Sequence, residues 1–209
     1  VAILMAQHVG APCKPLVKPG QQVLLGQMIG EPGGFVGAPV HASVSGTVKA
    51  IAPRVAANGL PAPAVIIEND GRDEWDPSVQ PPDGDPMALA PEELNARIRA
   101  AGVVGMGGAT FPTQVKLSPP SSKPIDTVIL NGAECEPYLT ADHRMMLESP
   151  EAIVDGLLIA MKILSAKTGV IGIETNKPDA ISAILAACAG KGVTVKPLYP
   201  KYPQGGEKQ

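Results

Sequence analysis

The stretch IDTVILN at residues 125–131, with SPEAIVDGLLIAMKIL at 149–164 and GVIGIE at 169–174, decides the fold of the second half of the chain. The first and third runs are short, apolar and rich in β-branched residues, which is typical of buried strands. The middle run has the length and the apolar spacing of a helix. A further helix is expected at 178–188 and a further strand at 193–195. Strands that alternate with helices in this way predict a parallel α/β sheet.

The two helices of this region carry recognisable signals. Ser149 is expected to be the N-cap of the first helix, with Pro150 at its first position. Apolar residues then recur at helical spacing, which predicts one buried face on each helix. The residues expected to point inward are Ile153, Leu157, Met161 and Leu164 in the first helix and Ile181, Ile184 and Leu185 in the second.

The N-terminal residues 1–75 have a different rhythm. Short β-like runs at 23–25, 27–29, 46–51 and 64–68 are separated by Gly- and Pro-rich turns. Frequent short strands with such punctuation predict a small β-sandwich or barrel. The fold class is therefore all-β followed by α/β.

Between these parts, residues 76–90 are rich in Pro, Asp and Gly and are the expected linker. A helix is expected to begin at Pro91 and to end at Gly102, with Leu94, Ile98 and Ala101 on one face. The predicted domains are thus 1–75 and 91–209.

The composition limits the functions that fit. The formal net charge is -3 and aromatic residues make up 3% of the chain, so neither a basic footprint nor stacking platforms for nucleic acid are expected. Membrane contact is expected only through a partner, because no apolar run is long enough to span a bilayer. The three cysteines, at 13, 135 and 188, and the three histidines, at 8, 41 and 143, are too scattered to predict a metal site.

A glycine-rich loop is the first candidate for chemistry. The sequence GMGGATFPTQVK occupies residues 105–116. Gly105, Gly107 and Gly108 lack Cβ atoms where a backbone would approach a ligand closely, and Lys116 adds positive charge. The loop is not a dinucleotide fingerprint, because Thr110 stands where G-x-G-x-x-G needs glycine. Taken alone, such a cluster is more often structural than ligand-binding.

The second candidate is NGAECEP at 131–137, directly after the first predicted strand. The carboxyl ends of parallel strands are where α/β folds place ligands. Asn131 offers a donor and an acceptor, and Glu134 and Glu136 point to opposite sides if the chain is extended there. A solvated turn is the alternative interpretation of the same residues.

Together these two segments resemble a known family. GMGGATFPTQVK, NGAECEPY at 131–138 and KYPQGGEKQ at 201–209 are similar to motifs of the C subunit of the Rnf ion-translocating electron transport complex. The loop also resembles that of the flavin-bearing, NADH-binding subunit of respiratory complex I. QHVGAP at 7–12 and PVHASVSGTV at 39–48 match the Rnf family as well. The resemblance covers nearly the whole chain.

This resemblance implies a Rossmann-like domain that binds FMN and NAD(H). The glycines of the loop and Lys116 would hold the FMN phosphate and ribityl chain, while other residues would contact the flavin ring and the nicotinamide nucleotide. Met106 stands where complex I has Arg. Because the flavin carries the redox chemistry, no catalytic acid or base is expected. The implied cofactor-binding residues are Gly105, Gly107, Gly108, Phe111, Lys116, Asn131, Glu134, Glu136, Gly206 and Glu207.

The implied function is electron exchange between NAD(H) and FMN, followed by transfer to iron–sulfur clusters in a ferredoxin-like region beyond this chain. The chain would then be a truncated piece, incomplete at its C-terminus. Its partners would be the other subunits of the complex and, through them, ferredoxin, at the cytoplasmic face of the bacterial cell membrane. The alternative is a docking subunit that keeps the fold without flavin.

The N-terminal domain resembles a barrel-sandwich hybrid of the lipoyl/biotinyl type. A carrier domain of that type needs a lysine at its hairpin tip. The expected tip, EPGGFV at 31–36, has none. A packing or docking role is therefore expected for this domain.

Overall fold

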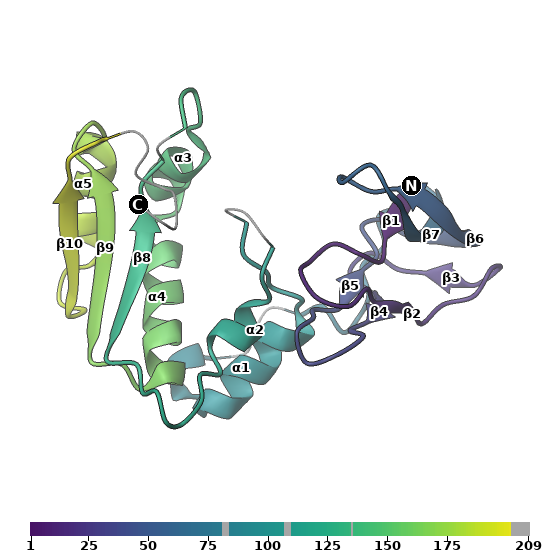
Figure 1. Cartoon of the computed structure of the whole chain (residues 1–209), viewed down its shortest axis with the longest axis horizontal. Helices are drawn as coiled ribbons and strands as arrows, with labels where there is room; N and C mark the ends of the chain where they lie inside the picture. Colours follow the sequence, from purple (N-terminus) through teal and green to yellow (C-terminus); the bar gives the residue numbers. More distant parts are fainter. Residues whose placement is uncertain (81–83, 107–109, 135, 202–209) are drawn as a thin grey trace. The chain divides into compact units, whose positions relative to one another are not determined.

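The computed structural model describes residues 1–80, 84–106, 110–134 and 136–201. Contacts divide the chain into two compact units, Val1–Ser118 and Pro119–Gln209, whose elements are labelled in Figure 1. Each unit is described by itself below. The domain boundaries drawn from composition, with a linker at 76–90, stay a prediction.

The first unit contains two antiparallel sheets. One has the strand order β1-β7-β6-β3 and the other the order β2-β4-β5. The predicted runs correspond to β3, β4, β6 and β7, whereas the other three strands are only two or three residues long and gave no pattern. The strands are β1 (Ala2–Leu4), β2 (Lys14–Pro15), β3 (Gln22–Val23), β4 (Met28–Glu31), β5 (Val40–His41), β6 (Gly46–Val55) and β7 (Pro61–Asn69).

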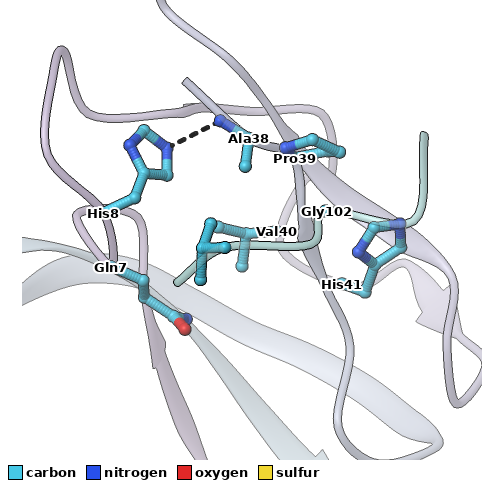
Figure 2. A pocket seen from close by; sticks show the side chains of 8 residues that line it. Gln7, His8, Ala38, Pro39, Val40, His41 and Gly102 are labelled. Carbon is cyan, nitrogen blue, oxygen red and sulfur yellow. Dashed lines mark hydrogen bonds between the residues drawn. The ribbon is translucent and has the colours of Figure 1, made fainter. Parts of the chain in front are cut away.

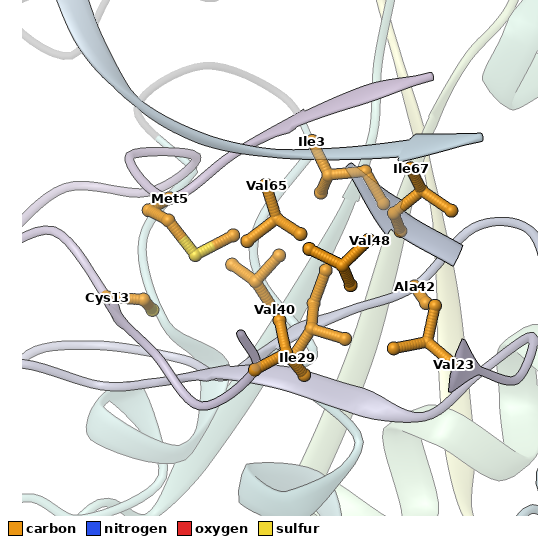
Figure 3. Packing of buried hydrophobic residues seen from close by; sticks show 11 residues of the cluster. Ile3, Met5, Cys13, Val23, Ile29, Val40, Ala42, Val48, Val65 and Ile67 are labelled. Carbon is orange, nitrogen blue, oxygen red and sulfur yellow. The ribbon is translucent and has the colours of Figure 1, made fainter. Parts of the chain in front are cut away.

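The core of this unit is formed by aliphatic side chains from both sheets. Figure 3 shows Val48 and Val65, on β6 and β7, facing Ile29 and Val40, on β4 and β5. Val65 and Ile67 of β7, two positions apart, both point into this cluster, as the twofold period of a strand requires. The structure thus confirms the expectation of a small β-sandwich or barrel, with two sheets around one core.

The described part of the first unit also contains the 3-10 helix η1 (Pro86–Ala88), α1 (Pro91–Ala100) and α2 (Thr113–Lys116). Helix α1 matches the predicted one. Leu94 is buried and Ile98 half-buried, but Ala101 is exposed, so the expected apolar face was wrong at its last residue. Gly102 ends the helix with a φ of +69°, and a Cβ there would lie 2.6 Å from the Pro39 carbonyl oxygen. This position therefore requires glycine.

The second unit is an α/β layer structure. Its three strands form a parallel sheet in the order β10-β9-β8, which confirms the predicted alternation of strands and helices. Helix α3, in which polar and charged residues make up half of ADHRMMLE, was not predicted. The elements are β8 (Thr127–Gly132), α3 (Ala141–Glu148), α4 (Pro150–Leu164), β9 (Thr168–Glu174), α5 (Pro178–Ala187) and β10 (Val193–Leu198).

One face of this sheet packs against the helices. Ile171 and Ile173 of β9 cluster with Leu157 of α4 and Ile184 of α5. On the opposite face Ile129 is 70% exposed, so the expectation that β8 is a buried strand was wrong. Strand β8 lies at the edge of the sheet in this unit, and the sequence could not give the strand order.

The helix predictions of this unit hold with two corrections. Ser149 occupies the N-cap position of α4, but its side chain makes no capping hydrogen bond. Leu185 is 52% exposed rather than inward, because α5 turns Ala180, Ile184 and Ala187 to the core instead. Ala180 and Ala187 are small and contribute little to an apolar pattern. The helical spacing of the larger side chains therefore predicted Leu185 as inward instead.

Candidate functional site

The glycine loop begins and ends in a short antiparallel bridge between Val104 and Pro112. The backbone N–H of Gly105 donates to the Phe111 carbonyl oxygen at 2.9 Å, and that of Thr113 donates to the Val103 carbonyl oxygen at 3.0 Å. These bonds fix the two ends of the loop. Gly107 and Gly108, predicted to contact the phosphate, lie outside the described residues.

Lys116, the last residue of α2, points back toward this loop. Its Nζ lies 6.0 Å from the centre of the Phe111 ring. A Cβ built on Gly105 would lie 3.2 Å from the same Nζ. The structure therefore brings together three residues that the sequence predicted as one site: Gly105, Phe111 and Lys116. The lysine is exposed, and no ion pair of Lys116 is found within the described part of the chain.

The loop also contains a conformation that non-glycine residues adopt rarely. Thr110 has a φ of +50°. A left-handed backbone conformation at a non-glycine residue costs on the order of 1 kcal/mol. Such conformations occur at binding sites more often than elsewhere. Met106, on the N-terminal side of the same loop, is almost fully exposed. The described ends of the loop thus lie next to a positive charge.

In the second unit, the segment after β8 lies at the carboxyl end of the parallel sheet, as predicted. The Asn131 side-chain oxygen accepts a hydrogen bond from the Ala133 backbone N–H at 3.0 Å, which starts a turn. Asn131 and Glu136 are both exposed. Their side chains are therefore accessible at the edge where α/β folds bind ligands.

Glu134 of the same segment points inward instead. Its two carboxylate oxygens accept hydrogen bonds from the backbone N–H groups of Asp142 and His143, at 2.9 and 3.1 Å. These groups belong to the first turn of α3, and Thr140, the N-cap residue, provides no side-chain cap. Glu134 thus supplies the cap from outside the helix. Its direct contact with a flavin stays a prediction.

Glu134 also meets a buried cation. Lys177 Nζ lies 3.4 Å from Glu134 Oε2 and 3.0 Å from Glu174 Oε2. Burial alone would raise the pKa of Glu134, but the two N–H groups and the Lys177 ammonium outweigh it, so this pKa lies below its ordinary value. The carboxylate is therefore ionised at neutral pH.

A second contact also involves helix α3. His143 Nε2 lies 2.9 Å from Asp179 Oδ1, which links α3 to the first turn of α5. This contact, together with the Ala180 backbone N–H, holds the pKa of Asp179 below its ordinary value. Both contacts therefore fix α3 against the residues that follow β9.

The other two histidines lie in the first unit, on a small cavity shown in Figure 2. One ring nitrogen of His8 contacts the Val9 carbonyl oxygen at 2.9 Å, and the other accepts from the Ala38 backbone N–H at 3.2 Å. Burial lowers the pKa of His41, although a hydrogen bond with the Ala100 backbone partly opposes this. Among the described residues, no group of three or more His, Cys, Asp or Glu could hold a metal ion.

Known proteins match both parts of the chain. The family described as the Nuo51 FMN-binding domain matches residues 98–209, which is more than half of the chain, and the RnfC barrel sandwich hybrid domain matches residues 1–72. The chain belongs to the RnfC family. The resemblance expected from the sequence is thus confirmed.

The relatives in this family are longer than the chain. The RnfC-type component of a Na(+)-translocating ferredoxin:NAD(+) oxidoreductase complex of Acetobacterium woodii is 52% identical over 100% of this chain and 47% of its own length. The proton-translocating counterpart of Clostridium ljungdahlii is 48% identical over 100% of this chain and 45% of its own. The corresponding component of an ion-translocating oxidoreductase complex of Pseudomonas aeruginosa is 45% identical over 98% of this chain and 26% of its own. The chain therefore spans half or less of these relatives.

The sequence did not identify two residues that matter to the site, Glu174 and Lys177. Glu174 is the last residue of the apolar strand β9, and Lys177 stands three positions after it. An acid and a base at that spacing beside the carboxyl end of a strand were the available signal.

Gly206 and Glu207, which were predicted to approach the flavin, lie outside the described residues. Within the part of the chain that the structure describes, no helix is long and apolar enough to cross a membrane.

Proposed function

We propose that this chain is the flavin-binding part of the RnfC component of an Rnf-type complex, exchanging electrons between NAD(H) and FMN. The observation that carries the proposal is the match of residues 98–209 to the Nuo51 FMN-binding domain. When bound, FMN supplies the conversion between two-electron and one-electron transfer. Iron–sulfur clusters elsewhere in the full-length protein would receive the electrons.

The glycine loop fits a phosphate group. At Gly105 the missing Cβ leaves room beside the Lys116 ammonium, so an anion could approach both the backbone and the charge. Phe111 lies under the lysine side chain and offers an aromatic surface. We propose that Gly105, Gly107, Gly108 and Lys116 hold the FMN phosphate and ribityl chain and that Phe111 lies toward the nicotinamide nucleotide.

The segment after β8 would contribute to the same function. Asn131 and Glu136 are exposed at the carboxyl end of the sheet and are proposed to contact the flavin and the nicotinamide nucleotide. Glu134 is proposed to belong to the flavin region as well. Gly206 and Glu207 would approach from a later loop. The three parallel strands support a Rossmann-like arrangement for this domain.

The proposed assembly is supported by the same family. We propose that the protein is a peripheral subunit at the cytoplasmic face of the bacterial cell membrane, with the other Rnf subunits as its partners and ferredoxin reached through the complex. The β-sandwich is proposed to have a docking or packing role, because its hairpin tip at 31–36 contains no lysine for covalent attachment. A docking subunit without flavin is the competing function.

Titration of the full-length protein with FMN and with riboflavin separates these two functions. We expect FMN fluorescence to be quenched on binding and riboflavin to bind about tenfold or more weakly, because it lacks the phosphate that Lys116 would neutralise. Equal binding of both flavins would argue against the glycine loop as a phosphate site. No flavin binding by a folded, full-length protein would favour the docking function.

A further inference from the structure

Three charged side chains meet inside the second unit, almost fully shielded from solvent. The exposed fractions of the Lys177, Glu134 and Glu174 side chains are 8%, 6% and 3%. The ammonium lies within 3.4 Å of one carboxylate and 3.0 Å of the other. Two buried negative charges therefore share one buried positive charge.

This cluster links the ends of two parallel strands. Glu134 follows β8, whereas Glu174 is the last residue of β9 and Lys177 stands just before α5. The turn between the last two is closed by the Lys177 backbone N–H, which donates to the Glu174 carbonyl oxygen at 3.0 Å. The position of Lys177 is thus fixed by its own backbone. The ammonium then fixes Glu134 and, through it, the start of α3.

We propose that Lys177 is a positioning residue of the flavin site, holding residues 131–134 and 136–140 in place through Glu134 so that Asn131 and Glu136 keep their accessible orientation. The inference rests on the proposed function for the flavin itself. Lys177 does not act on the ligand directly, because its side chain is buried and already paired with both carboxylates.

The charges around the cluster give the proposal a specific pH signature. Asp142 faces Glu134 from α3, where burial and the Glu134 charge raise the pKa of Asp142. His143 and Asp179 pair with each other nearby. Loss of the Lys177 ammonium would leave Glu134 and Glu174 buried together with Asp142 close by. One carboxyl would then have to take up a proton, and acid would restore the arrangement.

The test uses the full-length protein with Lys177→Met, Lys177→Arg and the double variant Lys177→Met/Glu174→Gln. Amide hydrogen exchange of residues 141–148, measured without flavin, reports whether Glu134 still caps α3. The FMN dissociation constant, measured by fluorescence quenching from about pH 6 to about pH 8, reports the site.

We expect Lys177→Met to speed exchange in α3 and to weaken FMN binding by about tenfold at high pH, with most of the loss recovered at low pH. Lys177→Arg keeps the charge and is expected to bind within a few-fold of wild type. The double variant removes one buried carboxylate and is expected to recover most of the binding. If Lys177→Met does not fold, the arginine and double variants still decide the charge dependence.

Two outcomes would overturn the proposal. FMN binding by Lys177→Met that equals wild type at every pH, despite faster exchange in α3, would make the cluster structural only. A pH-independent loss that the double variant does not recover would show that charge balance is not the cause. If wild-type protein binds no FMN, the proposed function fails, and faster exchange in Lys177→Met would then leave Lys177 a structural residue.

Discussion

Two lysines, Lys116 and Lys177, show how differently the two units handle a positive charge. Lys116 ends a four-residue helix in the first unit, is exposed, and lies beside a glycine and an aromatic ring. Lys177 lies in the second unit, is buried, and contacts two carboxylates. An exposed ammonium beside a glycine-rich backbone suits an external anion, whereas a buried and paired one suits internal structure.

This difference shows which sites a short stretch of sequence can reveal and which sites depend on long-range strand pairing. The Lys116 site is built from residues 105–116, so one short motif contains it. The Lys177 cluster joins residues about forty positions apart, and only the pairing of β8 with β9 brings them together. A motif therefore identifies the first lysine, and the sheet register is needed to find the second.

The largest expected effect comes from removing the buried charge. Lys177→Met should lower the free energy of unfolding by about 3–5 kcal/mol at neutral pH, because it leaves two buried carboxylates without their cation. Urea unfolding of the full-length protein, followed by far-ultraviolet circular dichroism, measures the change. Lys18→Met, on an exposed lysine of the first unit, is the matched control and should change it by less than about 0.5 kcal/mol. A loss as small as that of the control would remove the contrast between the two lysines.

Lys116→Ala should give the opposite pattern. We expect FMN binding to weaken by about 10- to 100-fold, the usual worth of a hydrogen bond to a charged group, with the unfolding free energy nearly unchanged because the side chain is exposed. Flavin fluorescence quenching measures the first quantity and urea unfolding the second. Lys18→Ala again serves as the control. An unchanged dissociation constant would remove Lys116 from the flavin site.

The fold was largely predictable because its signals are local. The apolar runs at 125–131 and 169–174 and the Pro-initiated helices gave the α/β layer, and the regular turns gave the β-sandwich. The sequence could not show that β8 lies at an edge with Ile129 exposed, because strand order depends on long-range packing. The resemblance places Glu134 in the flavin region, and nothing local could show that its carboxylate also caps α3.

Lowering the pH is a further test of the contrast between the two lysines, because it acts on the buried cluster of Lys177, Glu134 and Glu174. The pKa of Glu134 is lower in the folded protein than its ordinary value of 4.5. Its contribution to stability is therefore complete above that value and is lost as the pH falls through the folded pKa. Urea unfolding at steps from about pH 7 to about pH 3 should show this loss in wild type and a flatter profile in Glu134→Gln. Identical profiles would mean that Glu134 gains nothing from its partners.

Gly105→Ala is expected to have the smallest effect and separates ligand approach from folding. A Cβ there would come closest to the Lys116 Nζ, the end of a flexible side chain, at 3.2 Å, so the protein should fold with nearly wild-type stability. The lysine would have to move aside from the place proposed for the phosphate, and FMN binding should weaken by a few-fold, about 1 kcal/mol or less. Gly102→Ala is the contrasting control. At that position φ is +69° and the clash is with a backbone carbonyl, so stability rather than binding should fall. Weakened FMN binding by Gly105→Ala together with a comparable loss of stability would show that this glycine serves the fold and not the ligand.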